Sequence, residues 1–217
     1  MIERVTFRAG ELALDGLLER PEGAAAWGGA VFCHPHPLYG GNMHNNVVWK
    51  VTPALIQSGL AVLRFNFRGV GRSQGTYADG EGEREDLRAA LAFLGGAEDM
   101  AGRPLVVLGY SFGAAVAARA VAKDSTGVAA LVCIALPVGL AGFGDFAELQ
   151  HVTLPKLFLA GTEDEFCPPP KLRELVRSLP EPRSLVVLDG ADHFFHGREP
   201  ELASHIAGFL NAQHPAT

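Results

Sequence analysis

Short apolar runs alternate with helical segments along almost the whole chain, and this alternation restricts the possible folds more than any other feature of the sequence. The apolar runs have the length of strands, and several are rich in β-branched residues, as is typical of strands buried on both faces. They cover residues 30–33, 60–65, 105–108, 128–135, 156–160 and 184–188. Helical segments cover residues 45–58, 80–95, 112–123, 169–179 and 199–210. The pattern predicts an α/β protein with a mostly parallel, doubly wound sheet that is covered by helices on both faces.

The first twenty residues depart from this alternation. Residues 5–7 and 12–19 both have strand character, and Ala9 and Gly10 lie between them. Two strands joined by so short a turn predict an antiparallel hairpin at the N-terminus. Because no repeat, charge block or linker divides the 217 residues, we expect a single domain over residues 1–217.

Composition and charge narrow the class of protein. The net charge is −6, whereas a nucleic-acid-binding protein would carry a basic surface, so we expect no nucleic acid partner. Three widely spaced cysteines, Cys33, Cys133 and Cys167, indicate free thiols rather than a disulfide framework. Residues 125–144 are uncharged, but Pro137 and three glycines interrupt them, which favours a buried strand and a loop over a membrane span. Since the chain also begins without an apolar signal segment, we expect a cytoplasmic protein.

The strongest motif is Gly-Tyr-Ser-Phe-Gly at residues 109–113, which lies between an expected strand and an Ala-rich helix. In a G-x-S-x-G turn from strand to helix, the serine side chain projects above the sheet, and glycines leave room for the sharp turn. The start of the helix offers backbone N–H groups to a developing oxyanion. Ser111 is therefore the predicted nucleophile.

A serine nucleophile requires an acid and a histidine, which follow it in that order on this architecture. Residues 157–165 run from a strand into an acidic loop, where Asp164 is the expected acid. Its flanking acids, Glu163 and Glu165, are expected in solvent. Asp192 is adjacent to the candidate histidine, but neighbouring side chains usually point apart.

The candidate base follows the next strand. His193 lies five residues beyond residue 188, at the end of a Gly-Ala-Asp turn, and the order of the triad favours it. His196 also lies in this loop, where we expect it to shape the site.

An oxyanion hole needs two N–H donors, of which Phe112 supplies the first. The second is expected in the loop after residues 31–33, where Pro35 and Pro37 have no N–H to donate. The amides of His36 and Leu38 are the two candidates.

Two other motifs suggest cofactors only weakly. His34, His36 and His44 are close in sequence, but neither an acid–histidine completion nor a cysteine pair accompanies them, so we expect no metal. Residues 66–75 are glycine-rich, but a loop and not a helix follows them, which argues against a dinucleotide site. We expect this segment to pack beside the active site, and we expect no cofactor.

Together these segments resemble the α/β-hydrolase superfamily from about Val5 to Leu210. The likeness rests on residues 109–113, 161–164, 190–193 and 66–73, and more specifically on residues 34–45 (His-Pro-His-Pro-Leu-Tyr-Gly-Gly-Asn-Met-His-Asn). The last segment is similar to that of small, cap-less bacterial serine hydrolases related to the dienelactone hydrolases and described as predicted carboxylesterases. Dienelactone hydrolases proper have a cysteine nucleophile. The serine at position 111 therefore moves the expectation from lactone opening to ester cleavage.

The resemblance implies a serine hydrolase that cleaves short-chain carboxylic esters through an acyl-enzyme. A thioesterase, a small-amide hydrolase or a non-catalytic interaction protein on the same scaffold are the alternatives. Residues 136–154 are too few for a cap domain, so the site should be open. We expect Tyr39, Tyr110 and Phe166 to contact a small ester substrate. We expect the protein to be either a monomer or a homodimer.

Overall fold

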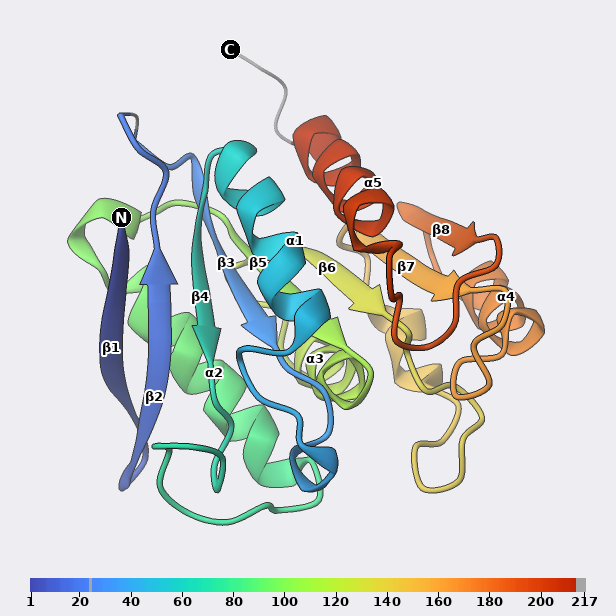
Figure 1. Cartoon of the computed structure of the whole chain (residues 1–217), viewed down its shortest axis with the longest axis horizontal. Helices are drawn as coiled ribbons and strands as arrows, with labels where there is room; N and C mark the ends of the chain where they lie inside the picture. Colours follow the sequence, from blue (N-terminus) through green and yellow to red (C-terminus); the bar gives the residue numbers. More distant parts are fainter. Residues whose placement is uncertain (24, 214–217) are drawn as a thin grey trace.

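Eight strands form one sheet in the computed structural model, which describes residues 1–23 and 25–213 (Figure 1). The order across the sheet is β1-β2-β4-β3-β5-β6-β7-β8. Only β1 and β2 are antiparallel to their neighbours, and all other pairs are parallel. The strands are β1 (Ile2–Ala9), β2 (Leu12–Glu19), β3 (Gly28–Cys33), β4 (Leu60–Phe65), β5 (Leu105–Tyr110), β6 (Val128–Ile134), β7 (Lys156–Gly161) and β8 (Arg183–Leu188). The predicted fold class and the N-terminal hairpin are confirmed.

Among the residues that the structure describes, five helices cover the two faces of the sheet. They are α1 (Asn46–Gln57), α2 (Glu81–Gly95), α3 (Phe112–Lys123), α4 (Pro169–Ser178) and α5 (Glu199–Gln213). Helices α1 and α5 pack together in front of the sheet in Figure 1, whereas α2 and α3 pack together behind it. No helix in the described part of the chain is long and apolar enough to cross a membrane.

The central strands form the core. Every residue of β3, β4, β5 and β7 is buried, as expected for parallel strands between two helical layers. The last strand differs, because β8 lies at the edge, pairs with β7 alone, and buries fully only Leu188. The three cysteine thiols are all buried, and burial raises the pKa of each.

The chain between β6 and β7 forms no cap domain. Its one regular element is a 3-10 helix, η3 (Ala147–His151). The carboxyl ends of the parallel strands are therefore left open on this side, where ligands bind in α/β sheets.

Buried ion pairs hold the loop after β4 in place. Arg68 donates to both oxygens of Asp86 on α2, at 2.8 to 3.1 Å, while its backbone N–H also donates to Asp86. The buried carboxylate of Glu83 accepts from the N–H groups of Ala78 and Gly80 at 3.0 and 2.8 Å. This glycine-rich segment is thus a rigid loop attached to the start of α2.

Candidate active site

Ser111 occupies a sharp turn between β5 and α3. Its φ of 56° and ψ of −118° are unusual for a residue with a side chain, and such a conformation costs about 1–3 kcal/mol. The surrounding backbone enforces it, since the Ser111 N–H donates to Ile134 O at 2.8 Å. A Cβ on Gly109 would lie 2.2 Å from Gly113 O, and one on Gly113 would lie 2.3 Å from Cys33 O. Both flanking glycines are therefore required by close backbone packing.

The structure brings the three predicted triad residues together from three loops. His193 Nε2 lies 3.0 Å from Ser111 Oγ, and His193 Nδ1 lies 2.9 Å from both oxygens of Asp164. Because a carboxylate only accepts hydrogen bonds, Nδ1 carries the proton and Nε2 is free to accept one from the serine. This arrangement is that of an activated hydroxyl nucleophile.

Two backbone amides fix the orientation of Asp164. Its Oδ1 accepts from Phe166 N at 2.9 Å and from Cys167 N at 2.8 Å, and its side chain is fully buried. The flanking Glu163 and Glu165 are exposed. Of the three acids in this loop, only Asp164 therefore faces the histidine.

The other candidate acid has a different role. Asp192 Oδ1 accepts from the N–H groups of Phe194 and Phe195 at 2.9 and 3.0 Å. These bonds close the turn that follows His193, so Asp192 shapes the histidine loop.

Tyr110 binds the backbone of the histidine loop. Its buried hydroxyl donates to His193 O at 2.9 Å, and burial raises the pKa of this phenol. The ring of Phe166 packs on the imidazole with centroids 4.8 Å apart. Both were expected to contact substrate, and both line the cavity, but the Tyr110 hydroxyl is engaged in positioning His193.

The two candidate oxyanion donors after β3 are placed differently. The Leu38 N–H donates to His36 Nδ1 at 3.2 Å, and the Leu38 side chain is 66% exposed and does not line the cavity. His36 does line the cavity, and its ring packs on Phe112 with centroids 4.7 Å apart. The Leu38 amide is therefore occupied within its own turn, which leaves His36 as the candidate beside Phe112.

A buried histidine holds this loop against the sheet. His34 Nδ1 lies 2.6 Å from Pro35 O, and its Nε2 accepts from Phe67 N at 3.1 Å. Burial lowers the pKa of His34 to about 4, so the ring is neutral at pH 7. Both ring nitrogens are engaged, so His34 joins the loops after β3 and β4.

The serine opens into a cavity of about 760 Å³ with aromatic walls. Six aromatic side chains line it, namely Tyr39, Tyr110, Phe112, Phe143, Phe166 and Phe194. None of the residues found to line it is Asp, Glu, Lys or Arg. The cavity therefore suits an uncharged, apolar ligand.

Part of this wall was not predicted from the sequence. Pro137, Leu140, Ala141 and Phe143 belong to the loop after β6, and Phe194 follows the histidine. The feature that could have identified them is their position in loops at the carboxyl edge of the sheet. Their side-chain directions were not predictable, because an irregular loop has no periodicity.

The chain is similar to a known protein family and to a bacterial relative. The alpha/beta hydrolase domain family matches residues 31–212. An uncharacterized protein of Rickettsia prowazekii, RP471, is 37% identical over 186 residues, which are 83% of this chain and 77% of that protein.

Two solved structures are similar over nearly their full length. The alpha-beta serine hydrolase homologue from Coxiella burnetii has a TM-score of 0.86 and 37% identity, covering 96% of this chain and 97% of its own. XC6422 from Xanthomonas campestris, a serine hydrolase without a lid, has a TM-score of 0.87 and 33% identity, covering 100% of this chain and 96% of its own. The predicted resemblance to cap-less serine hydrolases is confirmed.

Proposed function

The chain belongs to the alpha/beta hydrolase domain family, and on this premise we propose that it is a serine carboxylesterase acting through Ser111, His193 and Asp164. One observation carries the proposal. His193 Nε2 lies within hydrogen-bonding distance of Ser111 Oγ, while Nδ1 lies equally close to the Asp164 carboxylate. The three side chains have the geometry and the chain order of a Ser-Asp-His triad on this fold.

In the proposed reaction, Ser111 Oγ attacks the ester carbonyl while His193 Nε2 accepts its proton. Asp164 holds the imidazole in the required tautomer and stabilises its cation. The N–H groups of Phe112 and His36 stabilise the oxyanion of the tetrahedral intermediate. His193 then returns the proton to the leaving alcohol, and water, deprotonated by the same nitrogen, hydrolyses the acyl-enzyme. These residues supply all the groups that the reaction needs.

The walls of this cavity support an ester whose part inside the cavity is small and uncharged. The site has no lid, so a long acyl chain would leave much of its surface in water. Each further methylene contributes about 0.8 kcal/mol only when it is buried, so we expect the best rates with acyl chains of about two to six carbons.

The test is a series of p-nitrophenyl esters of increasing chain length, assayed with the wild-type protein and with Ser111→Ala. We expect hydrolysis that is greatest for short chains and is abolished in the variant, which should retain the wild-type melting temperature. A fluorophosphonate should phosphonylate Ser111 alone, with loss of fluoride and the serine proton, and mass spectrometry would locate the adduct. Residual turnover above roughly a tenth of wild type would refute the nucleophile, because losing a triad member leaves only a small background rate.

The same assay separates the alternatives. Faster cleavage of matched thioesters would identify a thioesterase on the same triad. An interaction protein would neither hydrolyse esters nor react with the fluorophosphonate.

A further inference from the structure

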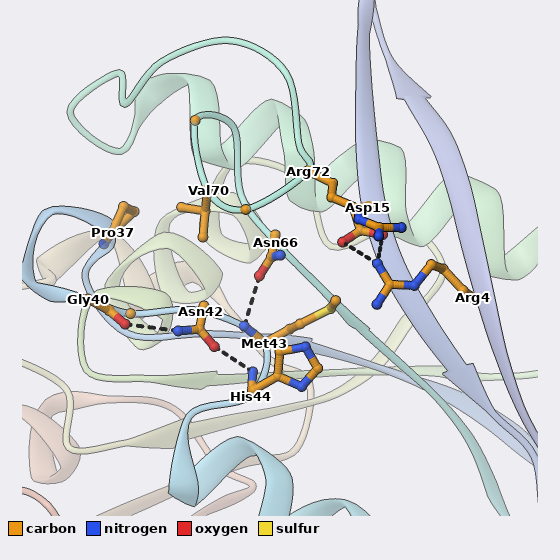
Figure 2. Close-up of a pocket in the computed structure, with 13 residues that line it drawn as sticks. Arg4, Asp15, Pro37, Gly40, Asn42, Met43, His44, Asn66, Val70 and Arg72 are labelled. Atoms are coloured by element: carbon orange, nitrogen blue, oxygen red, sulfur yellow. Dashed lines mark hydrogen bonds and ion pairs between the residues drawn. The ribbon is translucent and has the colours of Figure 1, made fainter.

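A second cavity, of about 680 Å³, is shown in Figure 2. Gly40 and Gly41 line both cavities, so the two meet at the turn that follows η1 (Pro37–Tyr39). Its other walls come from β1, β2, the segment before α1 and the loop after β4. Nothing in the proposed reaction uses this space.

The central polar group of this second cavity is the amide of Asn66, which is 4% exposed. Met43 N donates to Asn66 Oδ1 at 2.9 Å, as the dashed line in Figure 2 shows. Because the atom facing an N–H donor must be the oxygen, this bond fixes the orientation of the amide. Nδ2 is thereby turned away from Met43, and no acceptor for it is found within residues 1–23 and 25–213. Within the described residues the only fully buried side-chain nitrogen or oxygen without a partner is Glu199 Oε2, so Asn66 Nδ2 is accessible from the cavity, where a ligand or water can accept from it.

Glycine at position 71 keeps this donor uncovered. A Cβ on Gly71 would lie 2.7 Å from Asn66 Nδ2, so any side chain there would press on the amide. The backbone φ of +57° at this position also favours glycine. The loop after β4 thus leaves open a pocket with an N–H₂ group at its base.

The charges around this amide are positive on balance. Arg4 Nη1 donates to both oxygens of Asp15, at 3.0 and 3.2 Å, which leaves that pair neutral overall. Arg72 is exposed and lines the same cavity, as does the imidazole of His44. The lining side chains therefore carry one net positive charge at neutral pH, although the whole chain carries −6.

We propose that this cavity binds an oxyanion group, a carboxylate or a phosphate, with Asn66 Nδ2 and Arg72 as its donors. The group belongs either to the far end of an ester substrate or to a separate small anion. The second cavity adjoins the loop after β3 that carries His36. A Cβ on Gly41, which lines the cavity, would lie 2.1 Å from Pro35 O in that loop. Gly41 thus packs directly on the segment that holds His36.

The binding test is a titration of the ¹⁵N-labelled protein with inorganic phosphate, and separately with acetate, at constant ionic strength. We expect saturable shifts of the Asn66 side-chain N–H₂ signals and of the backbone signals of residues 69–72. In Asn66→Asp, phosphate affinity should fall about tenfold or more, because a charge-assisted hydrogen bond is replaced by repulsion. Arg72→Gln should lower it about two- to fivefold, because an exposed charge contributes less.

The matched control is Arg173→Gln, which removes the same charge from an exposed position on α4. It should leave phosphate binding unchanged. Shifts that do not saturate, or wild-type affinity in both Asn66→Asp and Arg72→Gln, would overturn the proposal. Arg72→Gln keeps the test decisive if Asn66→Asp fails to fold, because Arg72 is on the surface.

A pair of esters separates the two sources of the anion. The half-ester of a short dicarboxylic acid is compared with the corresponding neutral diester by the ratio of their kcat/KM values. If the anion belongs to the substrate, this ratio falls in Arg72→Gln and not in Arg173→Gln. If it is a separate ligand, the ratio is unchanged while the phosphate shifts persist. The titration requires no turnover, so a failure of the proposed esterase function would not affect it.

Discussion

The Asp164 carboxylate is held by two different sets of donors, and this double attachment sets its role. One set is the imidazole N–H of His193, and the other is the backbone amides of Phe166 and Cys167. We predict that Asp164→Asn lowers kcat by about ten-thousand-fold, as the same exchange does in a serine protease triad. The amide preserves the shape but favours the wrong imidazole tautomer and cannot stabilise its cation. Steady-state kinetics on the best ester would measure the loss.

Asp192→Asn is the matched control for this exchange. An asparagine oxygen can still accept from the amides of Phe194 and Phe195, so kcat should change by less than about tenfold. A severe loss in Asp192→Asn together with a mild one in Asp164→Asn would show that the acid is misassigned.

A substitution of Tyr110 tests how His193 is positioned and leaves Ser111, His193 and Asp164 unchanged. In Tyr110→Phe the ring stays, but the buried His193 O loses its donor, which costs about 1–3 kcal/mol of stability. We expect a lower melting temperature and a reduced kcat with little change in KM, because the base is displaced and the cavity wall is not. An unchanged kcat in a destabilised protein would show that this hydrogen bond serves only the fold.

At this scale the sequence predicted three side chains that lie together in the structure and not the details of their support. Ser111, Asp164 and His193 were identifiable because each follows an apolar run by a short step and their order matches the fold. The choice between the amides of His36 and Leu38 was not predictable. It depends on the direction of the His36 ring, whose Nδ1 takes up the Leu38 N–H.

At the scale of elements, the contact between the start of α3 and the end of β3 determines where Ser111 lies. Gly113 touches the backbone there, since a Cβ would lie 2.3 Å from Cys33 O and 2.5 Å from His34 O. We predict that Gly113→Ala lowers stability by about 1–3 kcal/mol through overpacking. It should also lower kcat strongly, because a shift of α3 moves the Phe112 N–H. Urea unfolding and ester kinetics would measure the two effects.

Gly208→Ala in α5 is the matched control. Nothing lies within 4 Å of a Cβ there, so the alanine should raise stability by up to about 1 kcal/mol through helix propensity. Equal behaviour of the two variants would mean that the contact between α3 and β3 does not govern the site.

Element boundaries were predictable where a turn ends the strand. Strands β4 and β2 match their predicted bounds, because turns end each of them. Strand β1 begins at Ile2 rather than Val5, since its first residues are exposed and polar side chains alternate with few apolar ones there. No apolar pattern marks such a segment.

At the scale of the whole molecule, the buried His34 couples stability to pH. The pKa of His34 is lowered to about 4 from an ordinary 6.5 because burial disfavours the charged ring. Above about pH 6.5 the ring is neutral in both states, and its stabilising effect is complete. As the pH falls from there towards 4, only the unfolded chain binds the proton, so the free energy of unfolding drops by about 3 kcal/mol. Urea unfolding at a series of pH values would measure this loss.

His34→Gln tests the source of this dependence. Its amide oxygen can still accept from Phe67 N, but it does not titrate. The stability of the variant should therefore fall less than that of the wild type between pH 6.5 and 4. Parallel curves for the two proteins would assign the acid sensitivity to other groups.

The edge position of β8 has a consequence for how the protein loses activity. Among the described residues, His193 follows the parallel strand that pairs on a single side and is mostly half-buried, whereas Ser111 follows a fully buried strand in the middle of the sheet. Proteins open locally in cooperative units, and edge elements with few buried contacts open at the lowest free energy. Separation of β8 from β7 would carry His193 away from Ser111 while the rest of the sheet stays folded. We therefore expect heating to remove hydrolase activity before the central strands unfold.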